Sequence, residues 1–336
     1  MRRFSYSRPT EVSEALAEAG GEDVRFLAGG TNLVDLMKEN VERPQHLVDI
    51  TRLPLDRIEE IQSGLKIGAL VLNSDLAHDP KVENRYPLLS LALLNGASPQ
   101  LRNSATTGGN LLQRTRCYYF YDVATACNKR DPGAGCQAIG GLTRLHAILG
   151  ASPHCIATHP SDMCVAMAAL DAVVHVESAT GTRTIPFEDF HRLPGDTPQR
   201  DTTLEPGELV TAVELPATRF DRHYTYLKLR DRQSYAFALV SVAAAMRLED
   251  GVMTDVRLAL GGVAHKPWRD RDAEALLSGK APERALFSKA AEAILADAQG
   301  QGANDFKIEL ARRAIVRGLD QAARGTPQSV TDKRIA

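Results

Sequence analysis

All five cysteines of the chain fall within one short stretch, and this clustering constrains the fold more than any other feature of the sequence. They are Cys117, Cys127, Cys136, Cys155 and Cys164. Disulfide frameworks are typical of small secreted chains with poor cores, whereas this chain has 336 residues, of which 43% are hydrophobic. We therefore expect two or three domains that are stabilised by apolar cores, and one local site that gathers cysteines.

The composition gives no reason to expect nucleic acid or a membrane as a partner. Lys and Arg number 40 against 42 Asp and Glu, a net charge of -2, so no general attraction to nucleic acid or to an anionic membrane is expected. No apolar run is long enough to cross a bilayer. The start Met1-Arg2-Arg3 resembles a twin-arginine signal, but Glu11, Glu14 and Glu18 follow where an apolar segment would be required. We therefore predict a globular protein without a membrane span or an export signal of its own.

The first two thirds of the chain show an α/β pattern that an irregular stretch interrupts. A strand at residues 24–28, a Gly-Gly turn, a helix at 33–38 and a strand at 47–50 form a β-α-β unit. The pattern also predicts strands at 65–70, 172–177 and 208–215, and helices at 88–95 and from 161 onward. Residues 96–110 are predicted as a loop, and residues 114–160 as an insertion folded around a site.

The last third of the chain is predicted to be antiparallel. Strands at 241–248 and 252–260 flank Asp250-Gly251, a pair of residues that favours a tight hairpin turn. Two helices are expected afterwards, at 284–298 and 305–325. A domain boundary is expected at 216–221, before this antiparallel part.

Two glycine-pair loops contain the residues best suited to bind a phosphate-containing ligand. Backbone N–H groups of residues 28–33 can close around a pyrophosphate, and residues 106–110 repeat the arrangement with Thr and Asn beside the glycines. In the sequence His159-Pro160-Ser161-Asp162, the carboxylate of Asp162 can accept hydrogen bonds from a ribose or ribitol hydroxyl. Each motif alone fits equally well with a structural turn or a helix cap.

The spacing of four cysteines, Cys117-x9-Cys127-x8-Cys136-x18-Cys155, lacks the local CxxC pair of common zinc modules. From residue chemistry alone, structural zinc and an iron–sulfur cluster both remain open, and unligated buried cysteines are a third reading. Five basic residues of this stretch would favour thiolates: Arg114, Arg116, Lys129, Arg130 and Arg144. Cys164 lies in an apolar helical segment and is predicted to be a small buried core residue.

Taken in order, the motifs resemble the FAD-binding subunits of molybdenum hydroxylases of the xanthine dehydrogenase type. They are AGGTN at 28–32, GASxQxRNxATTGGN at 96–110, HPSD at 159–162, Lys228 with Arg232 before YAFALV at 235–240, and GGVAHKPWR at 261–269. The match extends over nearly the whole chain. The resemblance is strongest to the medium subunits of periplasmic aldehyde oxidoreductases, which bind FAD and a 4Fe-4S cluster.

The resemblance implies an α+β fold. It consists of a vanillyl-alcohol-oxidase-like (PCMH-type) FAD-binding fold of two α/β subdomains, followed by a C-terminal antiparallel sheet with helices. The first subdomain is expected at 1–55 and the second at 56–220, with the insertion at 114–160. The C-terminal domain is expected at 221–336.

The resemblance also implies a role for individual residues. The residues that hold the diphosphate and ribityl chain of FAD are Ala28, Gly29, Gly30, Thr31, Asn32, Leu33, Thr106, Thr107, Gly108, Gly109 and Asn110. Asp162 holds FAD hydroxyls, and Lys228 lies near the isoalloxazine, where its ammonium would stabilise the reduced flavin. The implied ligands of a 4Fe-4S cluster are Cys117, Cys127, Cys136 and Cys155.

Finally, the resemblance implies an electron-transfer subunit of a heterotrimer. A large subunit with molybdenum cofactor oxidises an aldehyde, a small 2Fe-2S subunit relays electrons, and FAD in this chain passes them to an external acceptor. Export to the periplasm together with a signal-bearing partner is expected, and the cytoplasm is the alternative. The rival hypothesis is a self-sufficient flavin oxidoreductase in which the cysteines bind structural zinc.

Overall fold

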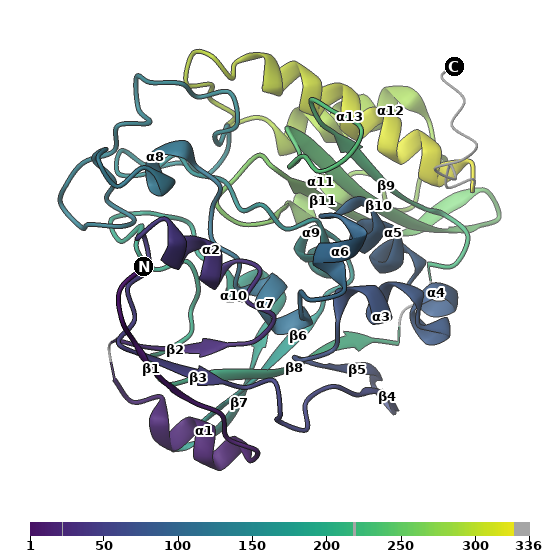
Figure 1. The fold of residues 1–336 in the computed structure, drawn as a ribbon. Helices are drawn as coiled ribbons and strands as arrows, with labels where there is room; N and C mark the ends of the chain where they lie inside the picture. The colour runs from purple at the N-terminus through teal and green to yellow at the C-terminus, as the bar shows by residue number, and fades with distance from the viewer. Residues whose placement is uncertain (22, 218–219, 326–336) are drawn as a thin grey trace.

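The computed structural model describes residues 1–21, 23–217 and 220–325, and the strands in this part of the chain form three sheets (Figure 1). Two of the sheets lie in the lower half of the view and the third lies above them, under the C-terminal helices. No helix in the described ranges is both long and apolar enough to span a membrane. The mixture of helices and sheets agrees with the predicted α+β class.

The N-terminal sheet is parallel, with strand order β1-β3-β2. Its strands are β1 (Ser5–Ser7), β2 (Val24–Leu27) and β3 (His46–Asp49), and its helices are α1 (Val12–Glu18) and α2 (Leu33–Lys38). Helix α2 connects β2 to the parallel strand β3, as the predicted β-α-β unit requires. The pattern analysis did not predict β1 and α1, because β1 has only three residues, which are mostly exposed.

The second sheet is antiparallel, with strand order β4-β5-β8-β6-β7. Its strands are β4 (Ile58–Ile61), β5 (Gly64–Gly68), β6 (Val173–Ser178), β7 (Gly181–Pro186) and β8 (Leu209–Pro216). Between β5 and β6 the chain leaves the sheet and forms α3 (Asn73–His78), α4 (Pro80–Arg85), α5 (Pro87–Asn95), α6 (Pro99–Arg102), α7 (Thr107–Leu111), α8 (Tyr118–Tyr121) and α9 (Asp162–Ala169). One further helix, α10 (Phe187–Phe190), follows β7.

The prediction of a continuous loop at 96–110 was wrong in part, because α6 and most of α7 lie within it. The hydroxyl of Ser98 accepts a hydrogen bond from the backbone N–H of Leu101, and the hydroxyl of Thr106 accepts one from Gly109. These side chains cap two short helices that contain too few apolar residues to show a helical period.

The C-terminal sheet has strand order β12-β11-β10-β9 and is antiparallel. It contains β9 (Tyr224–Leu229), β10 (Val240–Glu249), β11 (Val252–Gly261) and β12 (Trp268–Arg269), with α11 (Arg271–Ala275), α12 (Arg284–Ile294) and α13 (Phe306–Ala323) packed on it. The φ angles of Asp250 and Gly251 are 51° and 78°, so the predicted tight turn is confirmed. Helix α12 ends at Ile294, earlier than the predicted 298.

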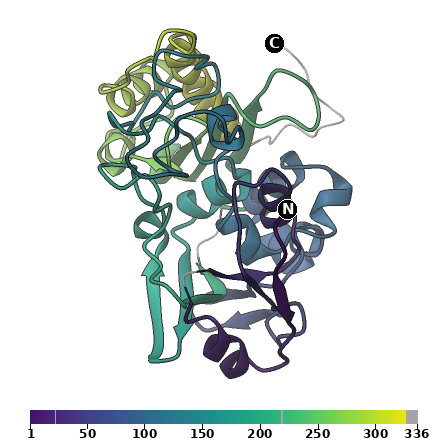
Figure 2. The ribbon, with the colours of Figure 1, turned by 60° about the vertical axis from the view of Figure 1, so that its left-hand side comes forward.

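The insertion at 114–160 is irregular, as predicted, and α8 is the helix assigned within it. Figures 1 and 2 both show its loops beside the C-terminal helices. Backbone hydrogen bonds join it to the segment after β11, from Ile148 to Val263 and from His159 to Ala264. The insertion is therefore attached to the C-terminal domain as well as to the chain that precedes it.

Candidate functional site

A cavity of about 650 Å³ collects residues from distant parts of the chain. Its walls include the loop after β2, the end of α5, α7, the start of α9, β9 and the loop that follows β9. The predicted FAD-site residues that line it are Thr31, Asn32, Gly109, Asn110, Asp162 and Lys228. The other predicted residues of the two glycine-pair loops do not line the cavity. Contacts with the rest of the protein explain why several of these positions have the residues they do.

Close packing of the two glycine-pair loops explains Gly29. A Cβ atom at this position would lie 1.8 Å from the backbone oxygen of Ser104. The Ser104 hydroxyl donates a hydrogen bond of 2.9 Å to the Gly29 carbonyl oxygen. Gly30 has a φ angle of 70°, which favours glycine. The glycine pair therefore brings the first loop against the second and directs Thr31 and Asn32 to the cavity.

Three predicted residues of the second loop anchor it to the protein. Thr106 caps α7, and the Thr107 hydroxyl donates a 3.0 Å hydrogen bond to the carbonyl oxygen of Val71. A Cβ atom at Gly108 would lie 3.0 Å from the Cβ of Ala69. These contacts fix the start of α7 on the segment after β5, and the next residues, Gly109 and Asn110, reach the cavity.

Three buried polar atoms at the cavity have no hydrogen-bond partner among the described residues. They are Asn32 Nδ2, Asn73 Oδ1 and Arg116 Nε, and all three residues line the cavity. Asn32 Oδ1 accepts a 2.9 Å hydrogen bond from the backbone N–H of Arg114, which orients the amide. An unpaired buried polar group costs about 1–3 kcal/mol. The two donors and one acceptor therefore fit a cavity that holds a polar ligand.

Asp162 and Lys228 form a buried ion pair at the cavity wall. Lys228 Nζ is 2.7 Å from Asp162 Oδ2 and 3.0 Å from the carbonyl oxygen of Asn95. The Tyr226 hydroxyl donates a 2.7 Å hydrogen bond to Asp162 Oδ1. Burial raises the pKa of Asp162, although Lys228 and Tyr226 oppose this shift. Both carboxylate oxygens thus have protein partners, which sequence reasoning had not predicted.

The four insertion cysteines influence one another electrostatically. Burial raises the pKa of Cys117 to about 12, and the charges of Cys127 and Cys155 contribute to the rise. Burial raises the pKa of Cys155 to about 11, with contributions from Cys136 and Cys127. Cys127 and Cys136 also face each other in an antiparallel bridge. Each of the four cysteines therefore lies near at least one other cysteine of the insertion.

No three of the four insertion sulfurs lie within 4.8 Å of one another. Among the described residues, one group of three His, Cys, Asp or Glu side chains has its ligand atoms within 4.8 Å of one another. It consists of His159, Cys164 and His191, so it includes none of the four insertion cysteines. A tetrahedral zinc ion with Zn–S bonds of about 2.3 Å would hold its sulfurs roughly 3.8 Å apart. No three of the four insertion sulfurs therefore lie as close together as a tetrahedral zinc ion would hold them.

Most of the basic residues of the insertion are bonded to groups other than the cysteines. Arg114 binds Glu42 and Asp201, and Arg144 binds Asp231. The remaining pairs are Arg116 with Asp35 and Arg130 with backbone carbonyl oxygens. Lys129 binds Asp201 and the carbonyl oxygen of Pro198, and its charge also lowers the pKa of Cys155. The sequence did not reveal these acidic partners because they lie far away along the chain.

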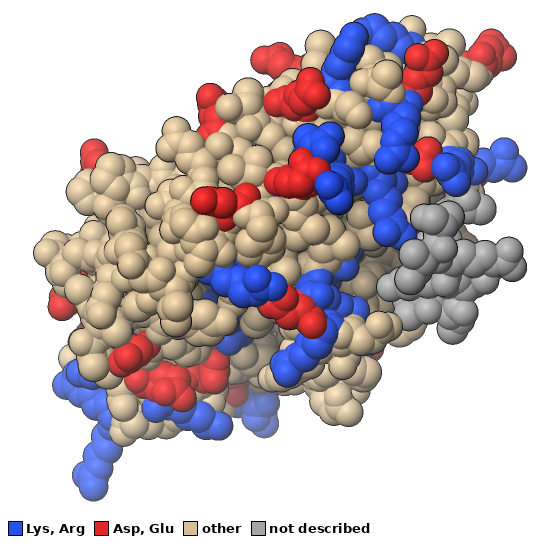
Figure 3. Space-filling view, turned by 90° about the horizontal axis from the view of Figure 1, so that it is seen from above, with Lys and Arg blue, Asp and Glu red and all other residues tan. Residues whose placement is uncertain are grey.

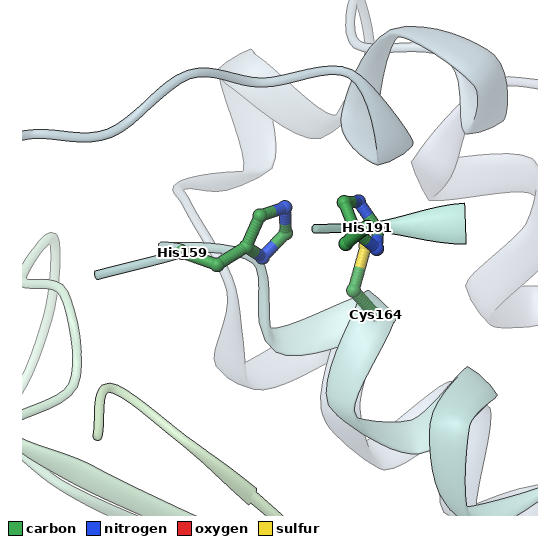
Figure 4. Close-up of side chains that lie close together, drawn as sticks. All are labelled: His159, Cys164 and His191. Carbon is green, nitrogen blue, oxygen red and sulfur yellow. The ribbon is translucent and has the colours of Figure 1, made fainter. Parts of the chain in front are cut away.

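His159, Cys164 and His191 form a buried group in the core (Figure 4). His191 Nε2 is 2.9 Å from the carbonyl oxygen of Leu111, so this nitrogen carries the proton. His159 Nδ1 accepts a hydrogen bond from the backbone N–H of Ser161, which leaves the proton on Nε2. Burial lowers the pKa of both imidazoles, so these side chains form a neutral buried group. Cys164 is fully buried, which confirms its prediction as a core residue.

Comparison with known proteins identifies the family. The family described as the FAD binding domain in molybdopterin dehydrogenase matches residues 2–218, and the CO dehydrogenase flavoprotein C-terminal domain matches 223–322. The chain belongs to the FAD-binding subunits of the molybdenum hydroxylases. It is 52% identical over 325 residues to the Escherichia coli aldehyde oxidoreductase FAD-binding subunit PaoB, covering 96% of this chain and 99% of that protein.

Other members of this family are more distant in sequence but similar in fold. The carbon monoxide dehydrogenase medium chain of Hydrogenophaga pseudoflava is 30% identical and covers 95% of this chain and 97% of its own length. A solved carbon monoxide dehydrogenase structure from the same organism superposes with a TM-score of 0.76 at 31% identity, covering 97% of this chain and 99% of that chain. The predicted fold and the assignment to an oxidoreductase subunit are therefore confirmed.

Both matched regions contribute to the cavity of this flavoprotein subunit. Thr31, Asn32 and Asp162 belong to the first region, whereas Lys228 and Phe237 belong to the second. Sequence reasoning missed Asn73 as a cavity residue and assigned Arg116 to the cysteines. The position of Arg116 directly before Cys117 could have indicated that this residue contacts both the cavity and the insertion.

Proposed function

We propose that this chain binds FAD in the 650 Å³ cavity and passes electrons through it to an external acceptor. The observation that carries the proposal is the cavity lined by both family regions, with Asn32 Nδ2, Asn73 Oδ1 and Arg116 Nε buried and unpaired at its wall. Bound FAD would supply the chemistry of accepting and releasing electrons. Thr31, Asn32, Gly109 and Asn110 would hold its polar chain, with the loops fixed by their own packing.

In the proposed complex, Lys228 would lie near the flavin ring, and Asp162 would contact hydroxyl groups of FAD. Lys228 is almost fully buried, so its positive charge acts in a medium of low dielectric constant. Because Asp162 already bonds to Lys228 and Tyr226, its role would be to hold the ammonium in place and to offer its remaining lone pairs to a hydroxyl.

We further propose that Cys117, Cys127, Cys136 and Cys155 hold a 4Fe-4S cluster. Four cysteines in one irregular insertion match the usual complement of such a cluster, and no three of their sulfurs lie within 4.8 Å of one another as around a single zinc ion. The raised thiol pKa values of Cys117 and Cys155 mean that these two cysteines would hold protons in the metal-free protein, which cluster binding would displace.

The assembly that we propose is a heterotrimer with a molybdenum-cofactor subunit and a 2Fe-2S subunit. Relatives named as medium chains or subunits support it, and an aldehyde substrate follows the name of the E. coli relative. Large apolar side chains that the insertion exposes are Tyr118, Val123, Ile139 and Leu142. The side of the molecule where Figure 1 places the insertion also shows few charges in Figure 3. We propose that the complex is exported to the periplasm with a signal-bearing partner.

Anaerobic flavin reduction tests the electron-transfer role. Aldehyde should bleach the FAD absorbance in the assembled complex but not in the purified single chain, because the aldehyde would be oxidised at the molybdenum-cofactor subunit. Dithionite should bleach both preparations. Bleaching of the single chain by aldehyde at the rate of the complex would replace the proposal with a self-sufficient flavoenzyme.

Single Cys→Ser substitutions test the cluster and its ligands. Cys117→Ser, Cys127→Ser, Cys136→Ser and Cys155→Ser should each deplete iron relative to flavin, because each removes one thiolate. Cys164→Ser is the matched control and should retain iron, since this cysteine lies in the core beside His159 and His191. Iron and acid-labile sulfide are measured per FAD. Full iron content in any of the four variants, or zinc in place of iron in the unaltered protein, contradicts the assignment.

A further inference from the structure

The imidazole of His146 lies against the sulfur of Cys117. The distance from His146 Nε2 to Cys117 Sγ is 3.1 Å, and His146 is 1% exposed. The other ring nitrogen, Nδ1, has no hydrogen-bond partner among the described residues. Within the described residues, the contact with Cys117 is thus the hydrogen bond of the ring, and the backbone of Thr143 is a second polar group that acts on it.

The backbone of His146 is held by the C-terminal domain. Its carbonyl oxygen accepts hydrogen bonds of 2.8 Å from Lys307 Nζ and 3.0 Å from Asn304 Nδ2. Its N–H donates a 2.9 Å hydrogen bond to the carbonyl oxygen of Thr143, whose hydroxyl bonds to Gln301. These anchors do not involve the cysteines, so the backbone that carries the ring is held independently of whatever the cysteines bind.

Cys117 and His146 occupy the side of the cysteine group that adjoins the main cavity. Both line a small cavity of about 30 Å³. Arg116, Tyr118 and Phe237 line this small cavity and also the 650 Å³ cavity. Cys117 therefore lies beside residues that also line the proposed flavin cavity.

We infer that His146 donates a hydrogen bond from Nε2 to the Cys117 thiolate and thereby raises the reduction potential of the proposed 4Fe-4S cluster. The inference rests on the proposed function. A metal-bound thiolate only accepts hydrogen bonds, so the ring proton belongs on Nε2 and the lone pair on Nδ1. Reduction adds one electron to the cluster and increases the negative charge on its sulfurs. A hydrogen-bond donor stabilises this reduced state more than the oxidised state.

Three variants test the inference by potentiometric titration of the reduced-cluster EPR signal. His146→Leu removes the donor and should shift the midpoint potential to more negative values. His146→Gln keeps an N–H donor and should shift it less. His154→Leu is the matched control, because His154 is next to Cys155 in sequence but its side chain is 48% exposed, and it should leave the potential unchanged. A wild-type potential in an iron-replete His146→Leu protein overturns the inference.

A second measurement uses the wild-type protein, so it can be made even if the His146→Leu variant fails to assemble its iron. In protein labelled with 15N-histidine, pulsed EPR of the reduced cluster should detect a 15N coupling that disappears in His146→Gln and persists in His154→Leu. Absence of the coupling in the labelled, iron-replete wild type overturns the inference. Failure of the proposed function looks different, because the wild-type protein would then contain no iron and sulfide and no cluster signal.

Discussion

The Lys228 ammonium and the Asp162 carboxylate form an ion pair between the two family regions of the chain. Their side chains are 2% and 7% exposed, and Tyr226 completes the hydrogen bonding of the carboxylate. Removing two charges from water is costly, so such a pair is tolerated when each charge keeps its partner. Loss of one partner leaves the other charge buried and alone, and this makes the pair a sensitive point of the structure.

Substitution of either partner should therefore destabilise the protein. Lys228→Met should lower the free energy of unfolding by about 3–5 kcal/mol, because Asp162 would remain buried without its counter-ion. The double variant Lys228→Met/Asp162→Asn should recover part of this loss. Urea unfolding of the FAD-free proteins measures both values, with exposed Arg313→Met as a control that should change nothing measurable. Strictly additive effects of the two substitutions would show that the pair is not coupled.

At the scale of elements, the candidate site depends on two loops that glycine allows to touch. The loop after β2 packs against the segment before α7 through Gly29 and Ser104. A methyl group at Gly29 would overlap the Ser104 oxygen, whereas the equivalent methyl at Gly20 would meet nothing within 4 Å. Backbone cannot yield as a flexible side chain can, so the loop must move when Gly29 is replaced.

Gly29→Ala should accordingly weaken FAD binding at least tenfold, or about 1.4 kcal/mol. The displaced loop would no longer present Thr31 and Asn32 to the cavity. Gly20→Ala serves as the control and should bind FAD as the wild type does. Titration of the apoproteins with FAD, followed by flavin fluorescence, gives the affinities. Equal affinities for the two variants would separate the loop packing from the binding site.

At the scale of the whole molecule, α13 connects the C-terminal domain to the insertion through one buried lysine. Lys307 Nζ donates hydrogen bonds to the carbonyl oxygens of His146 and Gly262, at 2.8 and 2.6 Å. Burial lowers the pKa of Lys307 from 10.5 to about 7. Between these two pH values the unfolded chain binds a proton at Lys307 that the folded protein has lost. The contribution of Lys307 to stability therefore rises with pH across that window.

Lys307→Met should remove this pH dependence. The free energy of unfolding of the wild type, relative to that of the variant, should be higher at pH 9 than at pH 7. Urea titrations of both proteins at the two pH values give the comparison, and subtraction removes the contributions of groups that the proteins share. A constant difference between the proteins would mean that Lys307 keeps its proton, and thus a higher pKa, in the folded state.

Several features of this protein followed from the sequence alone because they depend on residues that are close along the chain. Helix α2 matches the predicted 33–38, and the Asp250-Gly251 turn has the positive φ angles that its residues favour. The irregular insertion was visible in its lack of period, and the ordered motifs indicated the family that the comparisons confirm. Local periodicity, turn chemistry and motif order are properties of the sequence itself.

Only the tertiary structure determined which distant groups meet. The acidic partners of Arg114, Glu42 and Asp201, come from opposite sides of the sequence, and Tyr226 of strand β9 reaches Asp162 at the start of helix α9. The unpaired atoms of Asn73 and Arg116 at one cavity, and the contact of His146 with Cys117, were equally invisible. Burial and long-range pairing set the charge and hydrogen bonding of a side chain, and both depend on how the sheets and the insertion pack together.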